Sequence, residues 1–296
     1  MRHLNKNQDK KSILIVGSQG MLGREVVEVL QQDSWIQTFG GGEIHACDID
    51  EIDITDPQSI AQGFERFTAE LLINCAAYTD VDGCETNRRQ AFAVNGDGPG
   101  HLARACRAHH SKLIHISTDF VFNGRGDRPY QPEDPPDPIS VYGQSKLAGE
   151  RALQENIQDY IIVRTSWLFG KHGENFVSTI CRLGQERPYL EVVDDQVGSP
   201  TYAVDLARAL LHLAAAGARG IFHFSNEGHC TWYEFAGEIV RQFGLRTEIR
   251  PIRSEKLDRP ALRPSWSVMD ITRYKEATGQ SVRRWQDALA DYQRQF

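Results

Sequence analysis

The sequence contains no apolar run that approaches the length of a membrane-spanning helix, which needs about 20 residues. Its first eleven residues, Met1 to Lys11, are polar and charged and lack the apolar stretch of a signal peptide. Six cysteines are present, but no two form a Cys-x-x-Cys pair. These absences predict a cytoplasmic protein without a membrane partner, in which residues 1–11 form a loose tail and the thiols are reduced and buried.

The chain also lacks an excess of positive charge, because 33 Lys and Arg stand against 40 Asp and Glu. The net charge of −7 argues against nucleic-acid binding. It does not exclude an anionic ligand, since backbone N–H groups and a few arginines can hold phosphates. The histidines form no His-x-x-x-His pattern and no Cys/His cluster, so the sequence predicts no metal site.

What the chain does contain is an alternation of short apolar runs with helical patterns. At 296 residues it is long enough for one large α/β domain or two smaller ones. The alternation predicts a parallel, doubly wound sheet. We expect its strands at residues 13–16, 44–48, 71–74, 112–117 and 160–164, with residues 221–224 rejoining the sheet later.

A glycine-rich turn, Gly17-Ser-Gln-Gly20-Met-Leu-Gly23, follows the first of these strands and precedes a helical pattern. Strand, glycine turn and helix form the context of a dinucleotide-binding site, although three glycines can also form only a tight turn. Asp48 ends the second strand, where a carboxylate can accept hydrogen bonds from ribose hydroxyls. Such a carboxylate disfavours a 2′-phosphate and points toward NADH, unless Asp48 is an ordinary loop acid.

Tyr142 and Lys146 are four residues apart on a predicted helix and therefore share one face. An ammonium close to a phenol lowers the pKa of the phenol, which can then donate a proton to a reduced carbonyl oxygen. The pattern is loose, but Tyr142 is the only tyrosine of the nine with a lysine at this spacing. Thr118, at the end of the fourth strand, is placed to hydrogen-bond the same oxygen. We interpret His115, inside that strand, as a core histidine.

The glycine turn and the Tyr/Lys pair together resemble the extended short-chain dehydrogenase/reductase superfamily. Four further stretches, residues 117–122, 164–167, 195–201 and Arg263-Pro264, resemble the dTDP-4-dehydrorhamnose reductase family, from about Ser12 to the C-terminus. The resemblance implies a Rossmann-like fold and an enzyme that uses NADPH or NADH. It also implies reduction of the C4 keto group of dTDP-4-dehydro-6-deoxy-L-mannose to dTDP-L-rhamnose, and it leaves a homodimer open as an assembly.

The resemblance assigns roles residue by residue. The catalytic group is Tyr142, Lys146 and Thr118. The substrate contacts are Thr118, Asp119, Trp167 as a stacking ring, and Arg263 as a diphosphate ligand. Asn95 is expected to steady the structure near the catalytic helix. The cofactor contacts are Gly17, Gly20, Met21, Leu22, Gly23, Asp48, Asp53, Ile54, Ala76, Ala77, Thr79, Tyr142 and Lys146.

The pattern changes after Thr165, which predicts a second, smaller and discontinuous α/β domain for the nucleotide sugar. We expect residues 12–165 plus about 197–225 to form the dinucleotide-binding domain. Residues of about 166–196 plus 226–296 would then form the substrate domain.

Two other readings remain open from the sequence. One is a reductase or epimerase of another nucleotide sugar. The other is a non-catalytic regulatory subunit of the methionine adenosyltransferase type, which the Tyr/Lys motif alone does not exclude. The complete segments around Trp167 and residues 195–201 favour the enzyme.

Overall fold

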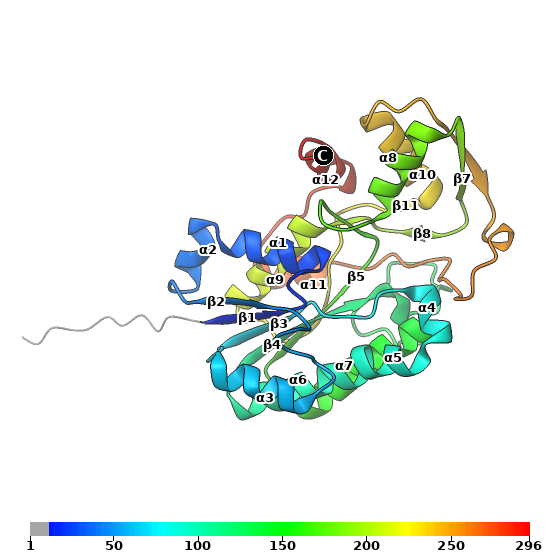
Figure 1. Ribbon diagram of the computed structural model, residues 1–296. Helices are drawn as coiled ribbons and strands as arrows, with labels where there is room; N and C mark the ends of the chain where they lie inside the picture. The colour runs from blue at the N-terminus through cyan, green and yellow to red at the C-terminus, as the bar shows by residue number, and fades with distance from the viewer. Residues whose placement is uncertain (1–11) are drawn as a thin grey trace, which may run out of the picture.

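A computed structural model describes residues 12–296, so the predicted tail at residues 1–11 lies outside the described residues. Six parallel strands form the central sheet in the order β10-β5-β4-β3-β1-β2 (Figure 1). This confirms the predicted doubly wound sheet, including the late return of the chain. The strands are β1 Ile13–Val16, β2 Ile44–Cys47, β3 Leu71–Asn74, β4 Lys112–Thr118, β5 Tyr160–Thr165 and β10 Gly220–His223.

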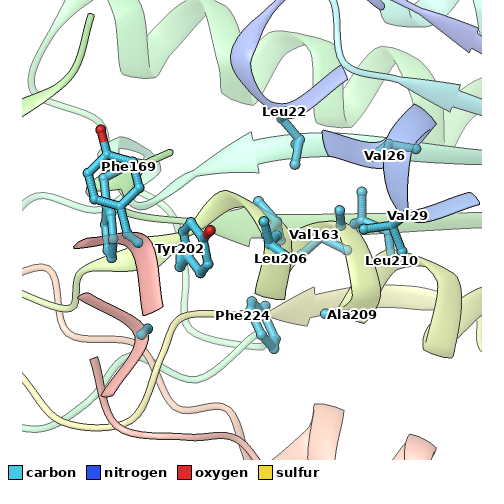
Figure 2. Packing of buried hydrophobic residues seen from close by; sticks show 14 of the residues in the cluster. Leu22, Val26, Val29, Val163, Phe169, Tyr202, Leu206, Ala209, Leu210 and Phe224 are labelled. Carbon is cyan, nitrogen blue, oxygen red and sulfur yellow. The ribbon is translucent and has the colours of Figure 1, made fainter. Parts of the chain in front are cut away.

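Apolar side chains on both faces of the strands explain why helices cover both sides of this sheet. Along β1, Ile13 and Ile15 belong to one apolar cluster and Leu14 and Val16 to another, because successive side chains point to opposite faces. On one face α1 Met21–Leu30 packs beside α9 Ala203–Ala215, through Val26, Val29, Leu206 and Leu210 (Figure 2). The other face carries α3 Pro57–Arg66, α6 Gly98–Ala108 and α7 Val141–Asn156 (Figure 1).

Short helices join or flank these layers. They are α2 Asp33–Thr38, α4 Val81–Thr86, α5 Arg88–Phe92, the π-helical turn η1 Ala93–Asp97, the 3₁₀ turn η2 Asp119–Val121 and α11 Thr272–Thr278.

Helix α7 begins where the Ser140 hydroxyl accepts a hydrogen bond from the Gly143 N–H at 3.2 Å. This cap fixes the residue at which α7 begins, and with it the positions of Tyr142 and Lys146 on the helix.

The remaining elements gather beyond one end of the sheet (Figure 1). They form three two-stranded pairs, with three α-helices and the 3₁₀ turn η3 around them. Their bounds are β6 Leu168–Phe169, α8 Phe176–Glu186, β7 Tyr189–Val193, β8 Val197–Gly198, β9 Thr201–Tyr202, β11 Cys230–Thr231, α10 Trp232–Gln242, β12 Glu248–Ile252, η3 Ser254–Lys256 and α12 Trp285–Gln293.

The apolar cluster on the α1 side continues into this second group of elements, through Phe169, Phe235 and Trp285. Strand β8, which we assigned to the first predicted domain, pairs with β11 of the second. The predicted division into two domains therefore remains a prediction, with one core running through both parts. Across residues 12–296, no helix combines the length and the apolar character needed to cross a membrane.

Candidate active site

A cavity of about 420 Å³ opens at the carboxyl ends of the central strands, on the edge where doubly wound sheets bind ligands. Side chains from the glycine turn, from the ends of β3, β4 and β5, and from α7 meet there. The cavity thus brings together ten of the residues expected from the sequence, namely Gly20, Met21, Leu22, Ala77, Thr79, Thr118, Asp119, Tyr142, Lys146 and Trp167.

Two glycines of the turn, Gly17 and Gly23, leave no room for side chains. Gly17 has a φ of 72°, and a Cβ there would lie 2.5 Å from the Ala76 backbone nitrogen. A Cβ at Gly23 would lie 2.2 Å from the Gly17 carbonyl oxygen. Helix α1 starts at Met21, and its N-cap residue Gly20 has no side chain to cap it, so no side chain pairs with the first N–H groups beside the cavity. This is the arrangement that holds a dinucleotide diphosphate at a helix N-terminus.

Asp48, at the end of β2, lies directly beside this turn. Its Oδ2 accepts a hydrogen bond from the Gln19 N–H at 2.8 Å, and its Oδ1 accepts one from the Ile49 N–H at 2.9 Å. Asp53 instead accepts hydrogen bonds from the Thr55 N–H and hydroxyl within a local turn. Along with Gly17, Gly23, Ile54 and Ala76, both acids lie outside the residues that line the 420 Å³ cavity.

Asn95 links the loop after β3 to α7, where we expected it to steady the structure. Its Oδ1 accepts a hydrogen bond from the Tyr78 N–H at 2.8 Å, and its Nδ2 donates to the Tyr78 carbonyl at 2.9 Å. The same nitrogen donates to the Ser145 hydroxyl of α7 at 3.1 Å. Because Asn95 is only 1% exposed, these bonds are shielded from water and fix the start of α7 against the cavity.

The predicted effect of Lys146 on Tyr142 is wrong for this structure. Desolvation raises the pKa of the Tyr142 phenol above its usual value; the neighbouring Thr118 hydroxyl partly offsets this, and Asp119 adds to it. Lys146 does not contribute, because its Nζ turns toward β4 and donates to the Ile116 carbonyl at 2.7 Å. Burial, partly opposed by Glu150, also lowers the pKa of Lys146 to about 8.

His115 is a buried core histidine, as predicted. Its Nδ1 lies 3.0 Å from Nδ2 of Asn74, and its Nε2 lies 3.4 Å from Nζ of Lys146. Burial and the Lys146 charge hold the pKa of His115 well below its ordinary value, so the ring is neutral.

A second cavity of about 850 Å³ meets the first at Asp119, Phe120 and Trp167. Asp119 is 2% exposed, and burial raises the pKa of its carboxyl to about 6. The Thr118 hydroxyl donates to Asp119 Oδ1 at 3.0 Å. The larger cavity is lined further by aromatic and cationic side chains, including Phe176, Tyr189, Trp232, Arg187, Arg259 and Arg263.

Trp167 borders both cavities, but neither face of its ring is open to them. A Cβ at Gly198 would lie 2.4 Å from Cε2 of the indole, 2.6 Å from Nε1 and 2.7 Å from Cζ2, which places Gly198 over one face. Trp232 stacks on the opposite face, with centroids 3.6 Å apart and planes within 10°. The ring of Trp167 therefore has no free face for the predicted stacking on a substrate. The backbone of Trp167 has a φ of 47°, in the left-handed region, and in this conformation the indole lies between Gly198 and Trp232.

Arg263 lines the larger cavity, but its guanidinium is already paired. Its Nη2 donates to Asp82 Oδ2 at 2.7 Å and its Nη1 to Asp82 Oδ1 at 3.1 Å. Asp82 lies on α4 beside the cofactor side of the site, so this pair connects the two groups of elements.

Sequence reasoning missed Trp232 and Arg259. The Thr231-x-x-Glu234 pattern is a capping box that marks the start of α10. It could have located Trp232 at a helix start, but not its contact with Trp167.

Within the described residues, Glu25, Glu28 and His172 lie close enough together to hold a metal ion, but they lie outside both cavities. His172 Nε2 lies 2.9 Å from Glu28 Oε1, and Lys171 pairs with the same carboxylate. The prediction of no metal site stays a prediction.

A family model described as "RmlD substrate binding domain" matches residues 11–296. A dTDP-4-dehydrorhamnose reductase of Streptomyces griseus is 42% identical over 285 residues, which cover 94% of this chain and 91% of the relative. A dTDP-4-keto-6-deoxy-D-glucose reductase of Streptomyces niveus is 38% identical over 279 residues, covering 93% and 94% of the two chains.

A solved dTDP-4-dehydrorhamnose reductase of Bacillus anthracis, in complex with NADP, superimposes with a TM-score of 0.92 at 35% identity. The match covers 97% of this chain and 100% of that one. These similarities confirm the expected Rossmann-like fold and the expected class of NAD(P)-dependent oxidoreductase. The chain belongs to the RmlD substrate-binding-domain family, which is the family of the dTDP-4-dehydrorhamnose reductases.

Proposed function

We propose that this chain reduces the C4 keto group of dTDP-4-dehydrorhamnose to give dTDP-L-rhamnose, with NADPH or NADH as the reductant. The convergence of Tyr142, Thr118 and Lys146 with the glycine turn on one cavity carries this proposal. The names of the relatives support the dTDP-linked substrate.

The protein's own groups supply binding, orientation and a proton. The nicotinamide cofactor supplies the hydride that goes to C4. Tyr142 donates its hydroxyl proton to the oxygen on C4, and Thr118 hydrogen-bonds that oxygen. Because desolvation raises the pKa of the phenol, Tyr142 keeps its proton until negative charge develops on the sugar oxygen.

The residues of the smaller cavity, together with the segments beside it, fit a dinucleotide. Gly17 and Gly23 let the backbone approach closely, and the start of α1 offers N–H groups to the diphosphate. Asp48 is assigned to the adenosine ribose, Asp53 and Ile54 to the adenine side, and Lys146 to the nicotinamide ribose. Ala76, Ala77 and Thr79 are assigned to the wall against which the cofactor lies.

The larger cavity is assigned to the nucleotide sugar. Its volume of about 850 Å³ and its junction with the smaller cavity at Asp119 allow the sugar to reach Tyr142 while the nucleotide extends away. Asp119 and the edge of Trp167 are assigned to the sugar. Arg263 is assigned to the diphosphate, which requires its guanidinium to leave Asp82 at least in part.

NADPH and NADH oxidation with a panel of dTDP- and GDP-linked 4-keto sugars tests the proposal. We expect net cofactor consumption with dTDP-4-dehydrorhamnose and dTDP-L-rhamnose as the product. Faster turnover of dTDP-4-keto-6-deoxy-D-glucose would favour the activity named for the Streptomyces niveus relative. Conversion without net cofactor consumption would indicate an epimerase, and cofactor binding without any turnover would favour a regulatory subunit.

Location and assembly are separate parts of the proposal. We assign the protein to the cytoplasm, where a dTDP-sugar and a reduced nicotinamide cofactor are both available. A homodimer stays a prediction, and light scattering of the purified protein measures it directly.

A further inference from the structure

Three buried side chains, Asn74, His115 and Lys146, form a hydrogen-bonded chain behind the cofactor cavity. They are 1%, 1% and 2% exposed, respectively, so water does not compete for their polar atoms. Asn74 ends β3, His115 lies within β4, and Lys146 lies on α7. These hydrogen bonds therefore join the end of β3 and the middle of β4 to the catalytic helix.

The position of the ring proton on His115 follows from the amide of Asn74. Asn74 Oδ1 accepts a hydrogen bond from the Ala76 N–H at 3.0 Å, so Nδ2 is the atom that faces His115 Nδ1 at 3.0 Å. Since Nδ2 only donates, Nδ1 must accept, and a neutral imidazole then carries its single proton on Nε2.

This N–H points at Nζ of Lys146, 3.4 Å away. An ammonium has three donors and no acceptor, so it would place a donor against a donor. A neutral amine has two N–H groups and one lone pair. One N–H donates to the Ile116 carbonyl at 2.7 Å, the lone pair accepts from His115, and the second N–H is left for the cavity that Lys146 lines.

We propose that His115 is a positioning residue that favours the neutral amine of Lys146 in the free protein, so that in mildly alkaline solution Lys146 takes up a proton from solvent when the dinucleotide binds. The inference rests on the proposed function, because it assigns Lys146 to the cofactor. The negative charge of the cofactor favours the ammonium form of Lys146. Nζ takes the proton from solvent and forms no covalent bond to the cofactor.

The charged and titratable groups around Lys146 agree with this assignment. Glu150, one turn along α7, favours the ammonium, but both of its oxygens are paired with Arg164 at 2.9 and 2.7 Å. Cys75 lines the same cavity as Lys146. Burial raises the pKa of its thiol to about 12, so the thiol carries no charge. Burial is the main cause that lowers the pKa of Lys146 to about 8.

NADPH binding, measured by its fluorescence between about pH 6.5 and pH 9.5 without any sugar, tests the proposal over a range that brackets the lysine transition. In the wild type, affinity should be constant up to about pH 8. It should then fall by up to about tenfold per pH unit, because each binding event must first protonate Nζ.

His115→Gln places a carbonyl oxygen within reach of Nζ and removes the opposed donor. The fall in affinity should then begin at a higher pH, so the variant should bind NADPH about threefold or more tightly than the wild type at pH 9. A histidine with only a structural role would weaken binding at every pH when replaced. His212→Gln is the control, since the half-buried His212 contacts the Tyr274 hydroxyl at 3.2 Å and lines neither cavity. It should leave unchanged the pH at which NADPH affinity begins to fall.

Asn74→Asp provides the second variant if His115→Gln does not fold. A carboxylate accepts from Nδ1, which moves the ring proton away from Nε2 and lets that nitrogen accept from an ammonium. In this variant, too, the pH at which NADPH affinity begins to fall should be higher than in the wild type. The proposal is wrong if NADPH affinity of the folded variants begins to fall at the same pH as that of the wild type. A wild type that shows the expected pH dependence of NADPH binding but reduces no 4-keto sugar would support this inference and overturn the proposed function.

Discussion

Tyr142 donates the proton in the proposed reaction, and its environment keeps that proton in place until it is needed. Tyr142→Phe keeps the ring and its edge contact with Phe120 and removes only the hydroxyl. We expect kcat to fall by about 10²–10⁴, the usual contribution of general acid catalysis. Cofactor affinity and melting temperature should be unchanged. Wild-type turnover in this variant would remove Tyr142 from the mechanism.

Trp232 has the aromatic ring that we expect to matter most for the nucleotide sugar, because both faces of Trp167 are covered. Trp232→Ala should raise KM for the sugar by about two- to tenfold, as expected for one lost aromatic contact. Cofactor affinity should change less. Trp35, which packs against Phe39 and His212 away from both cavities, provides the control: Trp35→Ala should alter stability but not KM. An unchanged KM in Trp232→Ala would mean that its stacking serves only to hold Trp167.

At this scale, residue types and spacing could predict which side chains gather at the site, but not how each is oriented. Tyr142, Thr118 and Lys146 do meet in one cavity. The direction of the Lys146 amine could not be predicted, because it depends on a carbonyl of β4 and on His115, neither of which is marked by the spacing of the motif.

Among the elements, the turn between β1 and α1 tolerates little change. Gly23→Ala would place a methyl group 2.2 Å from the Gly17 carbonyl oxygen, so the turn must open. We expect a loss of about 1–3 kcal/mol in the free energy of unfolding and at least tenfold weaker cofactor binding. Urea unfolding and fluorescence titration measure the two effects.

Gly237 is the matched control for this prediction. It also lies within a helix, α10, but a Cβ there would have nothing within 4 Å. Gly237→Ala should therefore stabilise the protein by up to about 1 kcal/mol through helix propensity. Equal effects of the two substitutions would show that the close approach at Gly23 is not what limits the turn.

Strand and helix positions were the part of the structure best predicted from sequence. The runs at residues 13–16 and 71–74 match β1 and β3, because buried parallel strands leave a continuous apolar signal. The pairing of β8 with β11 was not anticipated. Two-residue strands carry too few side chains to produce a periodic pattern, which is why the predicted domain boundary near residue 197 divides a strand pair.

For the whole molecule, the Asp82–Arg263 pair is one of the contacts that couple the cofactor side to the substrate side. The two residues are 181 positions apart in the sequence, so no local sequence pattern predicts their contact. Arg263 lowers the pKa of Asp82, which remains ionised at neutral pH and competes with any anionic ligand for the guanidinium.

Asp82→Asn should therefore lower KM for the nucleotide sugar by up to about fivefold, since partly exposed ion pairs contribute at most about 1 kcal/mol. Steady-state kinetics at saturating NADPH measures the change. The control is Glu133→Gln, which breaks the Arg273 pair outside both cavities and should leave KM unaltered. A raised KM in Asp82→Asn would indicate that the ion pair shapes the cavity instead of competing with the substrate.

The apolar cluster that contains Ile13 of β1 also contains Leu289 and Tyr292 of α12. During synthesis, the first strand is therefore made long before the last side chains that complete its cluster. Contacts of such sequence separation form late and slowly. A nascent chain that lacks α12 exposes Phe169 and Tyr202, whose rings lie against Tyr292 in the finished fold. Until the last helix emerges from the ribosome, this exposed aromatic surface makes the chain a candidate for chaperone binding or aggregation.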